Sequence, residues 1–491
     1  MILALLALFS RAGATPPNIV FILTDDLDLQ SIDQIPELRP LLQDAGVTYT
    51  HDYVSLSLCC PSRATILRGQ YAHNTGIYWN TGRNGGYPRF VSTGDEASTL
   101  GTWMRGAGYD TALFGKYLNG YPEKGQERKV PAGWADWIVP VAGNPYGEFG
   151  YTLNTLGRFR RYGRAARAYL TDVLSQRAVE YIHAETSRKS PFFLYLATYA
   201  PHSPETPAPR YASLYPNAQA PRSPAFNEED VSDKPSWLRN APPLDPKRIA
   251  DADARYRRRL QAMRAVVDLV AAVVQELTAD GALSSTYLVF TSDNGYHFGE
   301  HRMHVGKNTE YETDLRVPLI VRGPGLRAGT VNDDLVVNTD FAPTFTALAG
   351  TQPPVCSDGR DFLHPAGPAR QAFLIEHRGP APEPGPAEDA PPSVLEPADP
   401  GNGPNEEGGT ARVPVYVGVH TRDHVYVEFQ NGERELYDLQ KDPDELDNLA
   451  STAAAGLVGC LHDWLESLRH CSGASCRAAE DTAPGSCNGV E

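Results

Sequence analysis

The sequence has few cysteines for its length, seven in 491 residues, and the intervals between them do not match the paired CxxC knuckles of a zinc cluster. Four of the seven crowd the last stretch of the chain, at Cys460, Cys471, Cys476 and Cys487. We therefore expect two disulfides in this tail, a usage typical of an oxidising compartment. Four cysteines allow three pairings, and all three stay open at this point.

Positive charge is also scarce. The chain has 44 Lys and Arg residues against 60 Asp and Glu residues, a formal net charge of −16 that is spread along the sequence. This balance argues against a nucleic acid or an anionic membrane as a partner and favours a small-molecule or saccharide substrate. An acidic protein that binds an anion must gather cations in its cleft.

Long apolar runs are absent beyond the N-terminus, so we expect no membrane-spanning segment. Residues 1–14 are apolar and end in Ala12-Gly13-Ala14, which is typical of a secretory signal cleaved after Ala14. The segment lacks a basic n-region, so a misplaced start codon or a buried N-terminal segment is the alternative. With a signal, the mature protein is expected to be secreted or periplasmic.

Short apolar runs separated by helical patterns predict an α/β fold whose sheet is buried on both faces. The patterns between the runs, around 170–182 and 260–274, are amphipathic helices. No internal repeat is present. The predicted strands are 19–23, 111–114, 192–196, 287–290 and 319–321.

Composition divides the chain. We expect a catalytic domain over 15–378 and then a flexible insertion over 379–410, because that stretch is rich in Pro, Gly and Glu and has almost no large apolar residue. Residues 411–470 are predicted to form a small antiparallel sheet, with strands 413–419 and 424–429, and a helix near 457–468. Residues 471–491 form a tail that contains cysteines.

Polar residues follow several of the predicted strands at the point where ligands gather in open α/β sheets. Asp25 and Asp26 follow the first strand, and Asp293 and Asn294 follow the fourth. These are hard oxygen ligands, and carboxylates brought this close require a cation, so the sequence predicts a calcium or magnesium site. A helix cap or a turn is the alternative for any single Asp among them.

The histidines do not form a convincing set of zinc or copper ligands. His297, His301 and His304 are loosely spaced and could instead line the substrate pocket.

The segment 58–69, Leu-Cys-Cys-Pro-Ser-Arg-Ala-Thr-Ile-Leu-Arg-Gly, carries the most specific signal. Pro61 near the start of a short helix and Gly69 after it place Cys59 at the positive N-terminal end of that helix. An anion bound there meets free N–H donors, and Arg63 adds a permanent cation. The alternative is that the adjacent cysteines are small buried hydrophobes or half of a disulfide.

The pattern Cys-x-Pro-Ser-Arg, with a Gly six residues after the Arg, resembles the signature of formylglycine-dependent sulfatases. The resemblance spans nearly the whole mature chain and includes Ser292-Asp293-Asn294-Gly295, segment 307–312 and Glu435-Leu436-Tyr437-Asp438-Leu439. With Gly115-Lys116-Tyr117-Leu118-Asn119 it is most similar to the branch of N-acetylglucosamine-6-sulfatases and certain microbial arylsulfatases. It implies an alkaline-phosphatase-like fold, with a large, mixed, mostly parallel sheet flanked by helices and a smaller C-terminal antiparallel sheet plus helix.

The resemblance also implies an activity, the hydrolysis of an aryl sulfate or a sulfated sugar to an alcohol and inorganic sulfate. The nucleophile would be a formylglycine made from Cys59 by a formylglycine-generating enzyme, because a hydrated aldehyde can attack sulfur and later release sulfate. The implied metal ligands of a calcium ion are Asp25, Asp26, Asp293, Asn294 and the modified Cys59.

Four cationic or imidazole side chains complete the implied catalytic set. Arg63 would hold the formylglycine, while Lys116 and Lys307 would clamp the sulfate oxygens. His202 would contact the leaving oxygen and help to protonate it, with Lys307 as the rival acid.

One position departs from the family pattern, since many sulfatases have a His where this chain has Leu118. The base for the elimination step is therefore left open, with His73 and His304 as candidates and a supporting hydrogen-bond role as the alternative for His73. A phosphodiesterase or phosphonate monoester hydrolase on the same scaffold is the nearest competing function. A catalytically silent, calcium-bound carbohydrate-binding protein is another.

The sequence does not identify the sulfate ester or the oligomeric state. Tyr78, Trp79 and Trp137 are candidates to stack on a substrate ring, against ordinary packing as the alternative.

Overall fold

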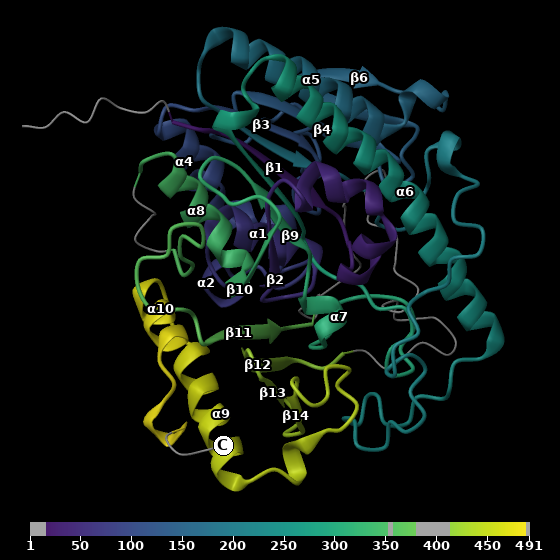
Figure 1. Ribbon diagram of the computed structural model, residues 1–491, viewed down its shortest axis with the longest axis vertical. Helices are drawn as coiled ribbons and strands as arrows, with labels where there is room; N and C mark the ends of the chain where they lie inside the picture. Colours follow the sequence, from purple (N-terminus) through teal and green to yellow (C-terminus); the bar gives the residue numbers. More distant parts are fainter. Residues whose placement is uncertain (1–15, 352–356, 380–412, 488–491) are drawn as a thin grey trace, which may run out of the picture.

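The computed structural model describes residues 16–351, 357–379 and 413–487. The expected signal segment, 1–14, lies outside the described residues, as does all of the expected insertion except residue 379. Figure 1 shows two layers of different size: a large sheet wrapped by helices, and below it a small sheet with the C-terminal helices against it.

The large sheet has ten strands and is mixed, as predicted. Strands β8, β1, β7, β3 and β4 pair in parallel at its centre. Strand β9 runs antiparallel between β8 and β2, and β5 runs antiparallel between β4 and β6. In spatial order the strands are β10 (Thr330–Val337), β2 (Val47–Tyr53), β9 (Leu319–Arg322), β8 (Thr286–Ser292), β1 (Asn18–Thr24), β7 (Phe192–Ala197), β3 (Asp110–Gly115), β4 (Asp136–Gly143), β5 (Tyr151–Thr155) and β6 (Arg158–Arg161).

Both faces of this sheet are buried, which explains why its central strands read as continuous apolar runs. On β1, Val20 and Ile22 pack in one core with the long helices α5 (Leu170–Arg188) and α6 (Pro246–Ala279). Phe21 points to the opposite face, into a core with α1 (Cys59–Arg68), α4 (Leu100–Gly106) and α8 (Phe341–Leu348). Figure 1 shows α5 and α6 on one side of the strands and α1, α4 and α8 on the other. The shorter helices are α2 (Ala72–Thr75), α3 (Gly86–Ser92) and α7 (Glu312–Leu315).

The small sheet is antiparallel, in the order β11 (Ala372–His377), β12 (Tyr416–Thr421), β13 (His424–Phe429) and β14 (Arg434–Asp438). Strand β11 lies before residue 379, so the small sheet takes its first strand from the range 15–378. Helix α9 (Ala455–Leu468) packs against this sheet, as expected for 457–468, and α10 (Ala474–Asp481) follows it.

The tail contains the two expected disulfides, and the structure selects one of the three pairings: Cys460 with Cys487 and Cys471 with Cys476. Cys59 and Cys60 are buried free thiols. Within the described parts of the chain, no helix has both the length and the hydropathy needed to cross a membrane.

Strand register brings the ends of the central strands to one level. Thr24 at the end of β1 pairs with Ser292 at the end of β8, and Leu23 of β1 pairs with Ala197 of β7. Gly115 at the end of β3 pairs with the same Ala197. The residues that follow these positions therefore emerge together at one edge of the sheet.

Candidate active site

Two pairs of side chains with carboxylate or amide oxygens meet where β1 and β8 end. Asp25 and Asp26 follow Thr24, Asp293 and Asn294 follow Ser292, and all four side chains are fully buried. The Asp26 amide donates to Oδ1 of Asp293 at 3.0 Å. Asp26 has a φ of 65°, in the left-handed region, so the chain turns sharply as it leaves the strand.

Cys59 is the first residue of α1, and the structure brings it to this acidic group. Its Sγ lies 3.5 Å from Oδ1 of Asp25 and 3.7 Å from Oδ1 of Asp26. Leu58 precedes the helix, and its apolar side chain cannot accept the first N–H groups of α1. The positive end of the helix therefore faces the same pocket as Cys59.

Three cations neutralise the three carboxylates. Nζ of Lys116 lies 2.7 Å from Asp25, Nε of Arg63 lies 2.7 Å from Asp293, and Nζ of Lys307 lies 2.6 Å from Oδ1 of Asp26. The Lys307 ammonium also donates to Sγ of Cys59 at 2.8 Å. These side chains are at most 3% exposed, so the charges face one another with almost no water between them.

The environment shifts the acids in different directions. Burial raises the pKa of Asp25, but Lys116, His202 and Arg63 outweigh it and hold that pKa below its ordinary value. Burial raises the pKa of Asp293 to about 6, and the opposing effect of Arg63 does not cancel it. The neighbouring cations therefore favour the ionised form of Asp25, whereas burial favours the protonated form of Asp293.

His202 reaches the same group from the loop after β7. Its Nδ1 lies 2.8 Å from the carbonyl oxygen of Ser203, which can only accept, so Nδ1 carries a proton. Nε2 then faces the site, 3.5 Å from Oδ2 of Asp26, and the ring packs 4.8 Å from that of Tyr146. A carbonyl thus sets the tautomer of an imidazole whose other nitrogen points to the acids.

The structure therefore brings the nine residues of the implied catalytic and metal-binding set into one buried cluster. They are Asp25, Asp26, Cys59, Arg63, Lys116, His202, Asp293, Asn294 and Lys307.

The donor atoms fit a hard cation. Atoms of Asp25, Asp26, Cys59 and His202 lie within 4.8 Å of one another. Oδ2 of Asp26 and Oδ1 of Asn294 are buried and make no hydrogen bond to any residue that the structure describes. Buried oxygens without partners are costly unless an ion takes them up, and carboxylate and amide oxygens are the ligands of calcium and magnesium.

Two positioning residues were missed by the sequence analysis. The buried guanidinium of Arg259 on α6 donates to the backbone oxygens of Asp26 and Pro201, so it braces the loops that carry Asp26 and His202. Tyr146 lies beneath the Lys116 ammonium, 5.1 Å from its ring centroid. Arg259 directly precedes the helical pattern predicted for 260–274, and its residue type gave no signal of burial, because Arg is mostly exposed.

The three histidines considered for the substrate pocket, His297, His301 and His304, contact other side chains of the protein. His297 lies 2.9 Å from Asp314, and His301 lies 2.6 Å from Glu228. Nε2 of His304 contacts Arg248.

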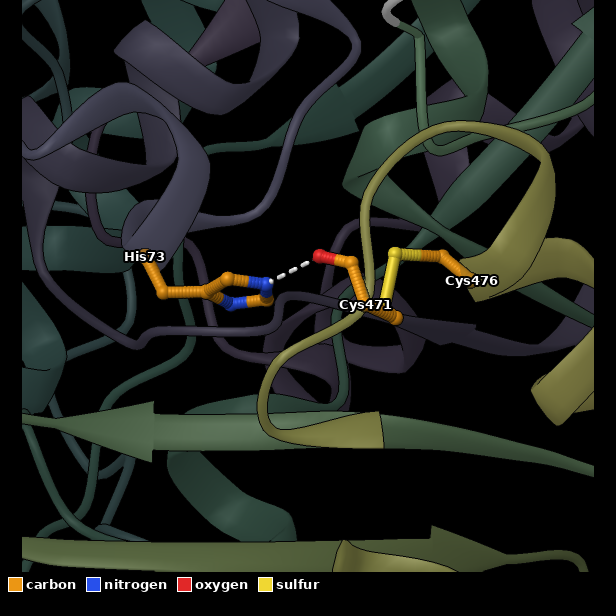
Figure 2. A group of neighbouring side chains, drawn as sticks. All are labelled: His73, Cys471 and Cys476. Carbon is orange, nitrogen blue, oxygen red and sulfur yellow. Dashed lines mark hydrogen bonds between the residues drawn. A yellow bond between two sulfur atoms is a disulfide. The ribbon is translucent and has the colours of Figure 1, made fainter. Parts of the chain in front are cut away.

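His73 on α2, considered as a base in place of Leu118, points to the C-terminal tail. Its Nδ1 lies 3.1 Å from Glu376 and its Nε2 lies 2.8 Å from the carbonyl oxygen of Cys471. Figure 2 shows this second contact beside the disulfide of Cys471 and Cys476. Both ring nitrogens are therefore committed to the tail and to β11. Leu118 itself is buried in the core.

The candidate stacking residues differ in their surroundings. Trp137 is fully buried among Tyr117, Tyr121 and Trp134, which is ordinary packing. Trp79 is half-buried with its ring 5.8 Å from that of His377, and the Arg378 guanidinium lies over the ring of Tyr78.

Comparison with known proteins identifies the fold and the family. The family model described as Sulfatase matches residues 17–351. The human protein named N-acetylglucosamine-6-sulfatase is 35% identical over 96% of this chain and 88% of its own. A protein solved in complex with its substrate D-glucosamine-2-N,6-O-disulfate superposes with a TM-score of 0.73 at 21% identity, covering 95% of this chain and 99% of that one.

The same fold carries another activity in a phosphonate monoester hydrolase from Silicibacter pomeroyi, which superposes with a TM-score of 0.66 at 20% identity and covers 91% of this chain and 93% of that one. Sulfatases generally use a formylglycine and a metal ion, and an Asp-rich group suited to a metal lies beside Cys59 here. With a family match over most of its length, this chain belongs to the sulfatase family and is a sulfuric ester hydrolase.

Proposed function

We propose that this sulfatase removes the 6-O-sulfate of a glucosamine-type sugar, with Cys59 as the site of the nucleophile and a calcium ion at the acidic group. The contact of Cys59 with Asp25, Asp26 and Lys307 is the observation that carries the chemistry. The sugar is supported by the human relative's name and by the substrate of the protein solved as a complex.

The calcium ion would be held by Asp25, Asp26, Asp293 and Asn294, with magnesium as the alternative. When bound, a divalent cation polarises a sulfate oxygen and acidifies a hydroxyl that contacts it. Three carboxylates facing three buried cations are neutral as a group, so a divalent ion makes the pocket positive. A positive pocket suits an anionic ester.

Cys59 would be oxidised by a formylglycine-generating enzyme, and the hydrated aldehyde supplies the hydroxyl nucleophile. Its place at the first turn of α1 directs backbone N–H groups toward an anion bound beside it. Arg63 holds Asp293 through the 2.7 Å contact and anchors the segment after β3 by donating to the backbone oxygen of Lys116 at 3.0 Å.

Lys116 and Lys307 would exchange part of their contact with the carboxylates for contact with sulfate oxygens. Both are flexible point charges with three donors each, so one ammonium can serve a carboxylate and a sulfate oxygen together. Charge builds up on the ester oxygens in the transition state, and preorganised cations stabilise it most there.

His202 would deliver a proton from Nε2 to the leaving oxygen. The Ser203 carbonyl holds the ring by Nδ1, so Nε2 is the nitrogen that gains and loses the proton. Oδ2 of Asp26 lies 3.5 Å from this nitrogen. Lys307 is the rival acid.

The enzyme would act outside the cytoplasm. The two disulfides of the tail are stable in an oxidising compartment, and residues 1–14 have the composition of a secretory signal.

The test compares purified chains made with and without a formylglycine-generating enzyme. Sulfate release would be measured from N-acetylglucosamine-6-sulfate, from its 3-sulfate isomer, from an aryl sulfate and from an aryl phosphodiester, all with calcium present. We expect the 6-sulfate to give the highest kcat/KM, and only in protein whose Cys59 peptide carries the aldehyde by mass spectrometry. A preference for the phosphodiester would overturn the proposal.

A further inference from the structure

A cavity of about 390 Å³ lies along the first half of α6, and most of the charged residues that line it are basic. Its basic groups are Lys247, Arg248, Arg255, Arg258 and His304, and the acidic residue among those that line it is Asp251. The whole chain has a formal net charge of −16, so a concentration of positive charge at one cavity is not a consequence of composition. Cavities lined by one sign of charge concentrate ligands of the opposite sign.

Helical geometry gives the cavity its length. Lys247, Asp251, Arg255 and Arg258 recur at intervals of three and four residues, so they lie in one row on α6. From Lys247 to Arg258 there are eleven steps along the helix, which span about 16 Å at 1.5 Å per residue. Figure 1 shows α6 along the side of the molecule, beside the loops that precede it. The basic residues that line the cavity therefore extend along the helix.

Two connections join this cavity to the active site. Arg255 and Arg258 both bind Glu205, at 2.6 Å and 3.1 Å, and Glu205 is three residues after His202 in the same loop. His304 and Val305 also line the cavity, and Lys307 follows two residues after Val305. The cavity thus adjoins both segments that supply proton-carrying groups to Cys59.

The cations of the cavity have acidic partners, Arg248 with Asp245 at 3.9 Å among them, but several of these pairs lie at the surface. Glu205 is one buried carboxylate shared by two guanidiniums, and the Arg258 side chain is 40% exposed. Lys247 pairs with Asp251 at 2.8 Å, but their side chains are 84% and 60% exposed. Pairs this exposed contribute little, so an incoming oxyanion can take over such a lysine at small cost.

We propose that this cavity binds a second anionic group, a sulfate or a carboxylate, of the saccharide whose sulfate ester is cleaved beside Cys59. The inference rests on the proposed function and extends it. The substrate is then an oligosaccharide with at least two anionic groups, and Lys247 and Arg258 are residues that determine this specificity. An aryl sulfate or a singly sulfated sugar would occupy only the Cys59 pocket.

The test compares two substrates in variants of the exposed cations. Substrate one is N-acetylglucosamine-6-sulfate; substrate two is a glucosamine and uronic acid tetrasaccharide with the 6-sulfate at its non-reducing end and further sulfates beyond it. The variants are Lys247→Gln, Arg258→Gln and the double variant; Arg258→Gln leaves Glu205 paired with Arg255. Lys441→Gln is the matched control, since Lys441 is 85% exposed and pairs at 2.6 Å with Asp438, three residues before it.

We expect the ratio of kcat/KM for the tetrasaccharide to that for the monosaccharide to fall about threefold in each single variant and about tenfold in the double variant, as is typical of contacts to exposed charges. The loss would lie in KM, and added salt would reduce the ratio of the wild type in the same way. Tetrasaccharides that lack either the uronic carboxyl or the further sulfates would identify the anionic group that the cavity binds. A ratio unchanged within twofold in the double variant would overturn the inference.

A binding measurement separates this inference from the proposed function. Tetrasaccharide affinity would be measured by calorimetry in a Cys59→Ala background, where turnover plays no part. Weaker binding in the double variant supports the cavity even if the cleaved ester proves to be a different one. Equal binding by the double variant and its Cys59→Ala parent would overturn the inference about the cavity. Failure of the wild type to release any 6-sulfate would instead overturn the proposed function.

Discussion

The ammonium of Lys307 donates to Sγ of Cys59 at 2.8 Å, and the same nitrogen lies 2.6 Å from Oδ1 of Asp26. One cation therefore touches both the proposed nucleophile and a proposed metal ligand, although 248 residues separate Lys307 from Cys59 in the chain. The contact exists because β1 and α1 deliver their ends to the edge of the sheet on which segment 307–312 folds.

Lys307→Met should lower kcat for an aryl sulfate by about 10²–10³-fold, the usual loss when one preorganised donor to the transition state is removed. Lys307→Arg should retain part of the activity because its charge remains. The measurement is steady-state kinetics at saturating calcium, with the aldehyde content of Cys59 determined in each variant. A kcat within tenfold of the wild type in Lys307→Met would contradict the role.

The adjacent cysteines should behave differently. Cys59→Ala should release no sulfate. Cys60→Ala should retain both the aldehyde at Cys59 and turnover, because the contact of Cys60 with Asn80 is made by the backbone amide. Loss of the buried Cys60 sulfur should cost about 1 kcal/mol of stability, as for other small core truncations. Mass spectrometry, sulfate release and denaturant unfolding test the pair, and an inactive but fully modified Cys60→Ala protein would count against the assignment.

The sequence predicted the position of the acidic residues at the strand ends for a physical reason. Strands buried on both faces, such as β1 and β8, read as unbroken apolar runs, so their ends can be located to within a residue or two. In parallel strands those ends share one edge, and Asp25 and Asp293 can then be placed together without knowing the register.

The sequence analysis did not find features that can be recognised only together with the segments that pack against them in the fold. Strand β2 reads Val-Thr-Tyr-Thr-His-Asp-Tyr, with intermediate burial at three of its seven positions, and resembles a surface segment until β9 and β10 flank it. Arg259 looks solvent-exposed by residue type, and only the tertiary structure supplies its backbone acceptors. Disulfide pairing likewise depends on the packing of α9 and α10, which periodicity does not report.

Calcium should stabilise the folded protein. Because it binds the native Asp group and not the unfolded chain, calcium at about one hundred times its dissociation constant should add about 2.7 kcal/mol to the free energy of unfolding. Thermal unfolding in calcium against a chelator measures this. Asp26→Ala should remove the calcium-dependent rise in Tm, whereas Asp44→Asn, a change in an exposed pair with Arg39, should preserve it. A full calcium response in Asp26→Ala would show that the ion binds elsewhere.

Glu148 should make stability depend on pH. Burial raises the pKa of this carboxyl to about 8, against hydrogen bonds from the amide and hydroxyl of Thr171 at the start of α5. Between about pH 4.5 and pH 8 the folded state thus holds a proton that the unfolded state has lost, and stability falls as pH rises through this window, by up to about 1.4 kcal/mol per unit.

Glu148→Gln should flatten that slope, because an amide can accept from Thr171 and does not titrate. Urea unfolding at intervals from pH 5 to pH 9 measures the effect, with Glu123→Gln, a change at a partly exposed glutamate, as the control. Parallel pH profiles for Glu148→Gln and the wild type would refute the prediction.

His73 should also make stability depend on pH, because its ring is a cation that lies between two hydrogen-bond acceptors. A neutral imidazole donates from one nitrogen only, yet its Nδ1 faces the Glu376 carboxylate and its Nε2 faces the Cys471 carbonyl, so the geometry requires both nitrogens to be protonated. Burial lowers the pKa of His73, but Glu376 and the Cys471 carbonyl outweigh it and raise that pKa above its ordinary value. The contribution is therefore complete below about pH 6.5 and is lost as pH rises through the folded pKa.

His73→Gln should accordingly lower stability by about 1.5–3 kcal/mol at pH 5, the range for hydrogen bonds to a charged group, and by less at pH 9. The loss should appear first as faster hydrogen exchange in α10, which the Cys471 contact holds against β11. His462→Gln is the control, because His462 also pairs with a glutamate, Glu428 at 2.8 Å, but from the exposed side of α9. An equal destabilisation by His73→Gln at both pH values would mean that the ring acts through packing and not through its charge.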